Sequence, residues 1–298
     1  MKRRPGYFLL GAPKCGTTAL ASYLDEHPLI YVSKPKEPHY FCKDLKAGGL
    51  PVKSDEEYLD TFSPGLDESE ALAAIDCSVW YLYSEVAVEE ILRFNPDAKF
   101  LIMLRNSVKM AWSYYCQMTF QRQEDQQDFF KAWEMQESRK NGNKLPAGLF
   151  DDMKMLLYSE VCALGSQLNK VVLKVPRDRL FVELQDSLKI NPKGVYLSVL
   201  NFMQIPHDGR DKFPKKNFSK KIKKPFIFKA LRSPIVMNTN NYVKKLLGIK
   251  SFGFGRPDLA MPSDVRSFLS HHFQDEIHLL EEILDRDLSE WLDISSSF

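Results

Sequence analysis

The sequence has little of what builds membrane, disulfide or zinc proteins. None of its apolar runs approaches the roughly 18 residues that a membrane-spanning helix needs. No CxxC pair occurs, and the five cysteines are scattered along the chain: Cys15, Cys42, Cys77, Cys116 and Cys162. This odd, scattered set argues against a disulfide framework and a cysteine zinc site. It fits a reducing cytoplasm, where we expect the protein to act.

An excess of charge of either sign is also missing. The 41 Lys and Arg residues nearly balance the 39 Asp and Glu residues, so the formal net charge is +2. No strong overall field therefore draws the chain to nucleic acid or to a membrane surface. Anion binding has to come from local clusters, and we expect no nucleic-acid partner.

The amino terminus faintly imitates a signal peptide, because basic Met1–Arg4 precedes apolar Tyr7–Leu10. The apolar run is too short, and Pro13 and Lys14 interrupt it. We therefore predict that this segment is a buried first strand.

Apolar strands and amphipathic helices alternate along the 298 residues. We predict strands at Tyr7–Leu10, Lys99–Leu104 and Arg179–Leu184, helices at Thr17–Glu26, Glu85–Phe94, Val108–Phe120 and Val195–Met203, and a helical stretch over Pro262–Asp287 with Ser263 as its N-cap. The continuous apolar run at Lys99–Leu104 is typical of a parallel strand covered on both faces. The pattern predicts a single α/β domain over residues 1–298, with a central parallel sheet between helical layers. Residues from about 208 to 256 are irregular and are expected to cover the active site.

A glycine loop stands between the first strand and the first helix, with Gly11, Lys14, Gly16, Thr17 and Thr18 in the segment GAPKCGTT. Backbone amides and the helix dipole form an anion site at such a position. Gly11 permits a tight turn, and Gly16 lets the backbone approach a phosphate closely. The fold we expect is thus a P-loop-like three-layer sandwich.

Two alternatives remain for this loop: a plain strand–helix turn, and a nucleoside triphosphatase loop of the form GxxxxGK[ST]. The glycine spacing fits the second, but Thr17 stands where the lysine belongs and the only lysine is Lys14. The next apolar strand ends in Arg105-Asn106 rather than in a magnesium-binding aspartate. The segment favours a phosphate-like group that is bound without a metal.

A second anion element follows the strand Lys99–Leu104. Arg105 lies at the carboxyl end of this strand, where open α/β sheets bind ligands, and Ser113 lies about two turns into the next helix. Arg105 offers a bidentate contact to a phosphate, and Ser113 offers a hydroxyl. A surface ion pair of Arg105 is an equally good interpretation of this element alone.

Together the two elements resemble the sulfotransferases that use 3′-phosphoadenosine-5′-phosphosulfate (PAPS), of the heparan-sulfate sulfotransferase type with its soluble bacterial relatives. GAPKCGTTAL resembles the family's 5′-phosphosulfate loop, and LRNSVKMAWSYY resembles its 3′-phosphate element. Lys34–Phe41 resembles the KEPHFF segment, Ile75–Leu82 resembles the SPxYL segment, and weaker similarity continues through Arg179–Leu184 and Asp287–Trp291. The resemblance spans nearly the whole chain. It implies sulfuryl transfer from PAPS, with the nucleotide PAP as product and no metal.

The sequence departs from the family pattern at several positions. Ser107, Met110 and Phe254 stand where members carry Pro, a basic residue and Lys. Cys77 and Val79 stand where some members carry Lys and Pro. The change at Cys77 bears on the acceptor, so the acceptors of glycan-modifying relatives do not carry over.

The resemblance implies a set of nucleotide contacts. Lys14 would support the 5′-phosphate and stabilise the leaving group, and Arg105 with Ser113 would hold the 3′-phosphate. The further nucleotide-binding residues that it implies are Cys15, Gly16, Thr17, Thr18, Lys215, Lys216 and Arg256.

A dense lysine run contains two of these residues and comprises Lys212, Lys215, Lys216, Lys220, Lys221, Lys223 and Lys224. A nucleic-acid or lipid patch, a solvated loop and a loop over the nucleotide are all open interpretations of it.

The resemblance also implies the acceptor side of the site. Glu37 matches the family's general base, and His39 is the second candidate base and an acceptor contact. A surface ion pair with a neighbouring lysine is the alternative for Glu37, and a structural role is the alternative for His39. Asp76, Trp80 and Tyr81 are expected to contact or wall the acceptor, with a loop or core role as their alternative.

We therefore expect a sulfotransferase that acts on a hydroxyl or nitrogen of a small natural product, sugar or lipid. The second hypothesis is a nucleoside-triphosphate-binding kinase or switch, and the third is a binding module without catalysis. We expect no membrane span, and a homodimer is left open.

Overall fold

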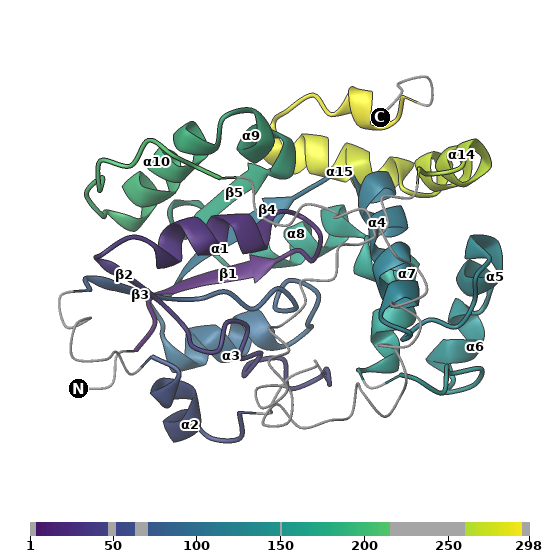
Figure 1. The fold of residues 1–298 in the computed structure, drawn as a ribbon, viewed down its shortest axis with the longest axis horizontal. Helices are drawn as coiled ribbons and strands as arrows, with labels where there is room; N and C mark the ends of the chain where they lie inside the picture. The colour runs from purple at the N-terminus through teal and green to yellow at the C-terminus, as the bar shows by residue number, and fades with distance from the viewer. Residues whose placement is uncertain (1–3, 47–51, 63–70, 150, 215–259, 294–298) are drawn as a thin grey trace, which may run out of the picture. The chain divides into compact units, whose positions relative to one another are not determined.

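The computed structural model describes residues 4–46, 52–62, 71–149, 151–214 and 260–293. A five-stranded parallel sheet lies at its centre, in the order β2-β3-β1-β4-β5 (Figure 1). The strands are β1 Tyr7–Gly11, β2 Ile30–Val32, β3 Ala73–Asp76, β4 Lys99–Leu104 and β5 Leu180–Leu184. The predicted parallel sheet is confirmed, and β4 has the bounds expected from its apolar run.

Strand β1 is the middle of the sheet. Phe8 of β1 is in register with Asp76 of β3 on one side and with Phe100 of β4 on the other. Phe8 and its two neighbours Leu9 and Leu10 are fully buried, as are Phe100–Leu104. Each such side chain contributes about 1.5–3 kcal/mol when it leaves water. The two adjacent strands therefore make a rigid apolar support for the loops at their carboxyl ends.

The direction of the chain connections places helices on both faces of the sheet. The connection β1–α1–β2 moves toward one edge, whereas β3–α3–β4 crosses back past β1 toward the other edge. Right-handed crossovers then put α1 (Thr17–Asp25) and α3 (Ala87–Phe94) on opposite faces. Figure 1 shows the two helices on either side of β1. The carboxyl end of β1 is thus the topological switch point, where open α/β sheets bind ligands.

Further helices complete the layers. They are α2 Asp55–Asp60, α4 Ser107–Phe120, α5 Phe129–Glu134, α6 Gln136–Lys140, α7 Tyr158–Val161, α8 Leu164–Val172, α9 Gln185–Ile190, α10 Pro192–Met203, α14 Ser263–His272 and α15 Gln274–Leu284, with 3-10 turns η2 Met153–Leu156, η3 Arg177–Arg179 and η4 Ser289–Trp291. Helix α10 begins earlier than predicted, because Pro192 suits its first turn and the Asn191 side chain accepts from the amide of Gly194. In the part of the chain that is described, no helix is long and apolar enough to cross a membrane.

The carboxy-terminal helical stretch differs from the prediction in two respects. The periodicity of residues 262–287 belongs to two helices, α14 and α15, which meet at the buried Phe273. Pro262, and not Ser263, is the N-cap residue of α14, and Ser263 is its first helical residue. Periodicity alone does not reveal the break, because Phe273 keeps the apolar spacing while its backbone leaves the helix.

Residues 208–214 are irregular, as predicted, and residues 215–256 of the predicted covering segment lie outside the described residues. The prediction that residues 1–298 form a single domain therefore stays a prediction.

Candidate active site

Most of the predicted site residues that the structure describes follow the carboxyl ends of the strands. Because all five strands are parallel, their carboxyl ends open on the same side. The glycine loop follows β1, the segment with Glu37 and His39 follows β2, the Asp76 segment ends β3, and Arg105 follows β4. Residues that are far apart in sequence are thus brought to a common edge.

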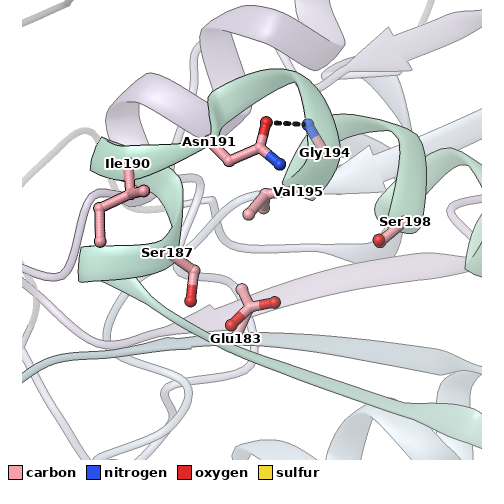
Figure 2. Close-up of a pocket in the computed structure, with 7 residues that line it drawn as sticks. All are labelled: Glu183, Ser187, Ile190, Asn191, Gly194, Val195 and Ser198. Carbon is pink, nitrogen blue, oxygen red and sulfur yellow. Dashed lines mark hydrogen bonds between the residues drawn. The ribbon is translucent and has the colours of Figure 1, made fainter.

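A cavity of about 420 Å³ opens between the carboxyl half of β5 and helices α9 and α10 (Figure 2). Its lining consists of Glu183, Ser187, Ile190, Asn191, Gly194, Val195 and Ser198. None of the residues predicted from the sequence lines it, and the Glu183 carboxylate accepts a hydrogen bond from Arg286 at 3.0 Å. This cavity is therefore separate from the candidate site.

The glycine loop has the backbone that its two glycines were predicted to allow. Gly11 has φ +145°, and a Cβ atom added there would lie 2.5 Å from the carbonyl oxygen of Val79. Gly16 has φ +89° and is the N-cap of α1. The first amides of a helix, here those of Thr17 and Thr18, have no acceptor within the helix. Such amides and the helix dipole suit an anion, and no acidic residue of the first turn opposes one.

Lys14 is held by its backbone. It has a left-handed φ of +69°, and its carbonyl oxygen accepts hydrogen bonds from two side chains. Arg105 Nη1 donates to it at 3.3 Å and Gln185 Nε2 donates to it at 2.9 Å. Since Arg105 follows β4 and Gln185 begins α9 after β5, the loop is tied to the ends of two neighbouring strands. Sequence analysis missed Gln185, and its only signal was its place directly after a strand.

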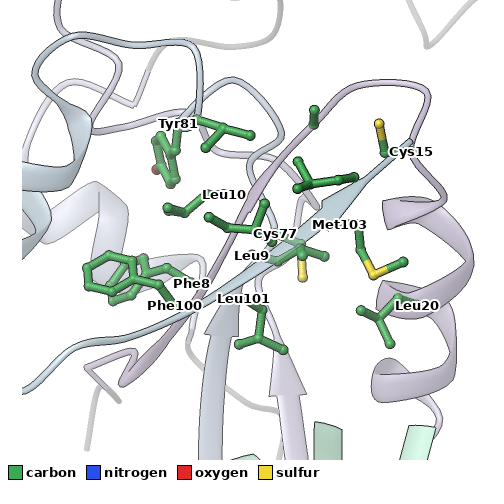
Figure 3. Close-up of a cluster of buried hydrophobic side chains, with 14 of the residues drawn as sticks. Phe8, Leu9, Leu10, Cys15, Leu20, Cys77, Tyr81, Phe100, Leu101 and Met103 are labelled. Atoms are coloured by element: carbon green, nitrogen blue, oxygen red, sulfur yellow. The ribbon is translucent and has the colours of Figure 1, made fainter. Parts of the chain in front are cut away.

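Cys15 and the two threonines of the loop differ in their exposure. The thiol of Cys15 is fully buried, lies 3.5 Å from the carbonyl oxygen of Pro13, and belongs to the apolar cluster of Figure 3. Burial raises its pKa to about 12. A contact of Cys15 with a nucleotide is therefore restricted to its backbone. Thr17 is buried and Thr18 is exposed.

Arg105 combines burial with a free donor. Its Nε atom is buried and has no hydrogen-bond partner among the residues that the structure describes. Burial lowers the pKa of Arg105. A partly desolvated guanidinium with a donor to spare is suited to an anion. Ser113, the predicted second contact, is half-buried on α4, the helix that follows Arg105.

Lys109, on the helix that follows Arg105, lies among other charged side chains. Burial lowers the pKa of Lys109 on α4, and the charges of Lys189 and Arg105 lower it further against the opposing charge of Asp186. Lys109 and Lys189 were not predicted as site residues. The sequence did not mark these two lysines, because a single lysine on a helix usually lies in solvent.

Glu37 and His39 form a pair on the loop after β2. His39 Nε2 lies 3.4 Å from Glu37 Oε2, and Lys36 forms an ion pair with the other carboxylate oxygen. Burial would raise the pKa of Glu37, but the hydrogen bond from His39 and the charge of Lys36 outweigh it and lower this pKa below its ordinary value. The lysine ion pair predicted as the alternative for Glu37 is thus present. With this ion pair formed, the Glu37 carboxylate still lies beside His39 on the loop that follows β2.

The side chain of His39 is 8% exposed, and its Nδ1 atom is buried without a hydrogen-bond partner in the described ranges. A nearly buried imidazole nitrogen without a partner is a candidate contact for a bound acceptor.

Asp76 and Tyr81, predicted to contact the acceptor, are fully buried. The Asp76 carboxylate accepts three hydroxyl hydrogen bonds, from Ser78 at 2.6 Å and from Tyr58 and Tyr81 at 2.8 Å each. Burial raises the pKa of Asp76, and the three donors offset part of this rise. The two side chains lie beneath the Glu37–His39 loop rather than on its surface. Trp80 is half-buried and packs against Tyr114.

Three predicted nucleotide contacts, Lys215, Lys216 and Arg256, lie outside the described residues, as does the lysine run apart from Lys212. Within the described part of the chain, no three His, Cys, Asp or Glu side chains are grouped so as to hold a metal ion.

Sequence comparison finds sulfotransferases. No protein-family model matches the chain. Carbohydrate sulfotransferase 15 of Rattus norvegicus is 28% identical over 149 residues, which cover 37% of this chain and 27% of that protein. Bifunctional heparan sulfate N-deacetylase/N-sulfotransferase 3 of Homo sapiens is 26% identical over 303 residues, which cover 97% of this chain and 31% of that protein. The chain thus spans about a third or less of the length of these relatives.

Structure comparison gives the same fold over the full length. A sulfotransferase from Alicyclobacillus acidocaldarius, solved by crystallography, matches with a TM-score of 0.72 and 24% identity, covering 98% of this chain and 100% of that one. This neighbour shows the fold, and the carbohydrate and heparan sulfate relatives found by sequence support the family predicted from the motifs. Together these comparisons support a PAPS-dependent sulfotransferase family for this chain.

Proposed function

We propose that the protein transfers the sulfuryl group of PAPS to a hydroxyl or nitrogen of a small acceptor. The observation that carries the proposal is that a helix amino terminus and an acid–histidine pair both follow the carboxyl ends of strands in the same sheet. A helix amino terminus is braced by Arg105 and Gln185 through Lys14, and the Glu37–His39 pair follows a strand of the same sheet. Anion binding and proton removal are the two tasks that sulfuryl transfer requires.

The nucleotide side fits a donor with phosphates at both ends. The amides at Gly16, Thr17 and Thr18 would hold the 5′-phosphate, together with the ammonium of Lys14. Arg105 and Ser113 would hold the 3′-phosphate, and the Nε of Arg105, which has no partner in the described ranges, would supply a donor. When bound, PAPS supplies an activated sulfuryl group. Lys14 neutralises the charge that develops on the leaving phosphate oxygen.

The acceptor side uses Glu37 as general base. Its pKa lies below the ordinary value of 4.5, so the carboxylate is ionised at neutral pH and can accept a proton, as a weaker base than a free glutamate. As the sulfur–oxygen bond to the nucleotide breaks, a bond from sulfur to the acceptor oxygen or nitrogen forms, and the acceptor proton moves to Glu37. The acceptor would then contact the Glu37 carboxylate alongside Lys36 and His39. The Nδ1 atom of His39 offers the acceptor a second contact.

A kinase or nucleoside-triphosphate switch is the second candidate. The spacing of Gly11 and Gly16 favours it. Thr17 in place of the loop lysine and Arg105-Asn106 after β4 disfavour it, because both depart from the residues that bind triphosphate with magnesium.

We propose a small natural product, sugar or lipid as the acceptor, and a cytoplasmic tailoring role in secondary metabolism. Sedimentation of the purified protein decides between a monomer and a homodimer.

Calorimetry with PAP, the product nucleotide, tests the proposal first. We expect tight binding that is unchanged by EDTA and weakened about a hundredfold in Arg105→Ala. Arg93→Ala is the matched control, since Arg93 is an exposed arginine of α3. Binding of ATP with magnesium in preference to PAP would favour the kinase hypothesis instead.

Transfer of radiolabelled sulfate from PAPS to a panel of small acceptors tests the chemistry. Glu37→Gln and Lys14→Ala should lower turnover by at least about a hundredfold while the fold is retained. Retained turnover in both variants would reject the roles given to these residues, and activity confined to long sulfated polysaccharides would reject a small acceptor.

A further inference from the structure

We propose that Asp76 is a positioning residue for the Glu37–His39 pair and acts through the hydroxyls of Ser78 and Tyr81. The inference rests on the proposed function, because it concerns the general base of that reaction. Asp76 itself touches neither member of the pair by a hydrogen bond between side chains in the described structure. It acts on the backbone of their loop instead.

The Ser78 hydroxyl connects Asp76 to the backbone of the loop, because it donates one hydrogen bond and accepts another. Ser78 has one hydroxyl proton and donates it to Asp76 Oδ1 at 2.6 Å. Its lone pairs are then left to accept, and the amide of His39 donates to Ser78 Oγ at 3.0 Å. Asp76 thus makes Ser78 an acceptor for the His39 backbone.

Tyr81 repeats this arrangement on the other carboxylate oxygen. Its hydroxyl donates to Asp76 Oδ2 at 2.8 Å and accepts from the amide of Phe41 at 3.4 Å. The Tyr81 ring also meets the His39 ring edge-on, with 6.5 Å between centroids. One buried carboxylate therefore orients two hydroxyls that together hold the loop on both sides of Tyr40.

The loop needs such support because of its backbone. Glu37 has φ +64° and His39 has φ +52°, both in the left-handed region that side chains with a Cβ atom rarely adopt. Residues keep such conformations only when the surrounding structure fixes them. The two hydroxyl bridges supply contacts that do so, at His39 and two residues beyond it.

The charged groups around Glu37 make the positioning measurable. Lys36 and His39 face the carboxylate from its own loop, and the buried neutral thiol of Cys77, directly after β3, lies within reach of its charge. The hydrogen bond from His39 and the charge of Lys36 hold the pKa of Glu37 below its ordinary value. If the His39 backbone is released, Glu37 loses a donor and its pKa rises.

Two tyrosines provide a matched pair of variants. Tyr58 and Tyr81 are both fully buried, and both donate to Asp76 Oδ2 at 2.8 Å. Of the two, only Tyr81 also accepts a hydrogen bond from the loop backbone, from the amide of Phe41. Tyr81→Phe therefore removes a bridge, whereas Tyr58→Phe removes a donor of the same kind from the same oxygen and leaves both bridges in place. Ser78→Ala removes the other bridge.

The pKa of Glu37, measured by carbon-13 NMR titration of its carboxyl group and assigned with Glu37→Gln, is the first readout. We expect a rise of about half a unit or more in Ser78→Ala, a smaller rise in Tyr81→Phe and none in Tyr58→Phe. Turnover with PAPS should fall at least about tenfold in Ser78→Ala, while PAP affinity stays within about threefold.

An unchanged Glu37 titration in Ser78→Ala and Tyr81→Phe overturns the inference, as does an equal shift in all three variants. If Ser78→Ala does not fold, the comparison of Tyr81→Phe with Tyr58→Phe decides alone. Failure of the unsubstituted protein to bind PAP would reject the proposed function. The NMR comparison would still show whether Ser78 and Tyr81 position Glu37, because it does not depend on PAP binding.

Discussion

Arg105 Nη1 donates to the carbonyl oxygen of Lys14 at 3.3 Å, so the residue after β4 supports the loop after β1. The contact joins the two anion elements that the sequence shows separately. Because Arg105 keeps its Nε free of partners in the described structure, the same side chain can brace the loop and contact an anion. Loss of Arg105 should therefore disturb both ends of a bound nucleotide.

This double use of the guanidinium makes Arg105→Lys informative. Lysine keeps the charge, but its single ammonium cannot brace Lys14 and contact a phosphate in the planar geometry of arginine. We expect PAP affinity to fall at least about tenfold, with a smaller loss than in Arg105→Ala. Calorimetry measures both variants under one salt concentration. Affinity equal to that of the unsubstituted protein would show that only the charge matters.

Gln185 should matter for nucleotide binding although no sequence motif contains it. Its amide donates to Lys14 O at 2.9 Å, and its Cγ atom lies 3.4 Å from the position of a Cβ atom on Gly16. Gln185→Ala should weaken PAP binding about fivefold or more with little change in unfolding temperature. Gln127→Ala is the matched control, since its amide also donates to a backbone oxygen, at 3.5 Å, on an exposed loop. Equal affinities in the two variants would contradict the role.

The parts of the site that the sequence predicted are those formed by neighbours along the chain. The glycine loop, its following helix and the strand before Arg105 depend on local turns and on a continuous apolar run, and both are visible in the sequence. Strands β2 and β3 escaped prediction, because they have only three and four residues and are buried throughout. Such short strands show no alternation.

The parts of the site that the sequence did not predict depend on contacts between residues that are distant along the chain. Gln185 reaches Lys14 across 171 positions, and Asp76 meets Tyr58 across 18. No local pattern marks either contact, since a glutamine at a helix start and a buried aspartate occur for many reasons. The lowered pKa of Glu37 depends in the same way on where the His39 side chain lies.

The glycines of the loop should differ in their tolerance of alanine. Gly11→Ala combines a φ of +145° with a Cβ atom 2.5 Å from the Val79 oxygen, so we expect a loss of about 2–5 kcal/mol in the free energy of unfolding. Gly16→Ala meets its nearest atoms at 3.4 Å, and its φ of +89° should account for a loss of about 1–2 kcal/mol. Urea unfolding measures both. Gly6→Ala, with no described atom within 4 Å of its Cβ position, should change stability by less than about 0.5 kcal/mol.

A buried ion pair between the loop after α4 and helix α6 gives a prediction about stability and pH. Arg139 donates to both oxygens of Glu124 at 2.7 and 2.8 Å, both side chains are fully buried, and Tyr158 donates to the same carboxylate at 2.7 Å. Burial would raise the pKa of Glu124, but these donors outweigh it and lower this pKa below the ordinary value of 4.5. Glu124→Gln leaves the Arg139 charge buried without its partner, so we expect a loss of about 3–5 kcal/mol at pH 7.

The sign of the pH dependence follows from the lowered pKa of Glu124. The contribution of this carboxylate is fully present above its ordinary value of 4.5 and is lost as the pH falls through its pKa in the folded protein. The stability difference between the unsubstituted protein and Glu124→Gln should therefore be constant from pH 7 to about pH 5 and shrink at lower pH. Urea unfolding across this range measures it. Glu90→Gln, which removes a carboxylate paired with the exposed side chains of Lys43 and Arg93, is the control and should cost less than about 1 kcal/mol throughout. A difference that grew as the pH fell would contradict the assignment of this carboxylate as the ionised partner of Arg139.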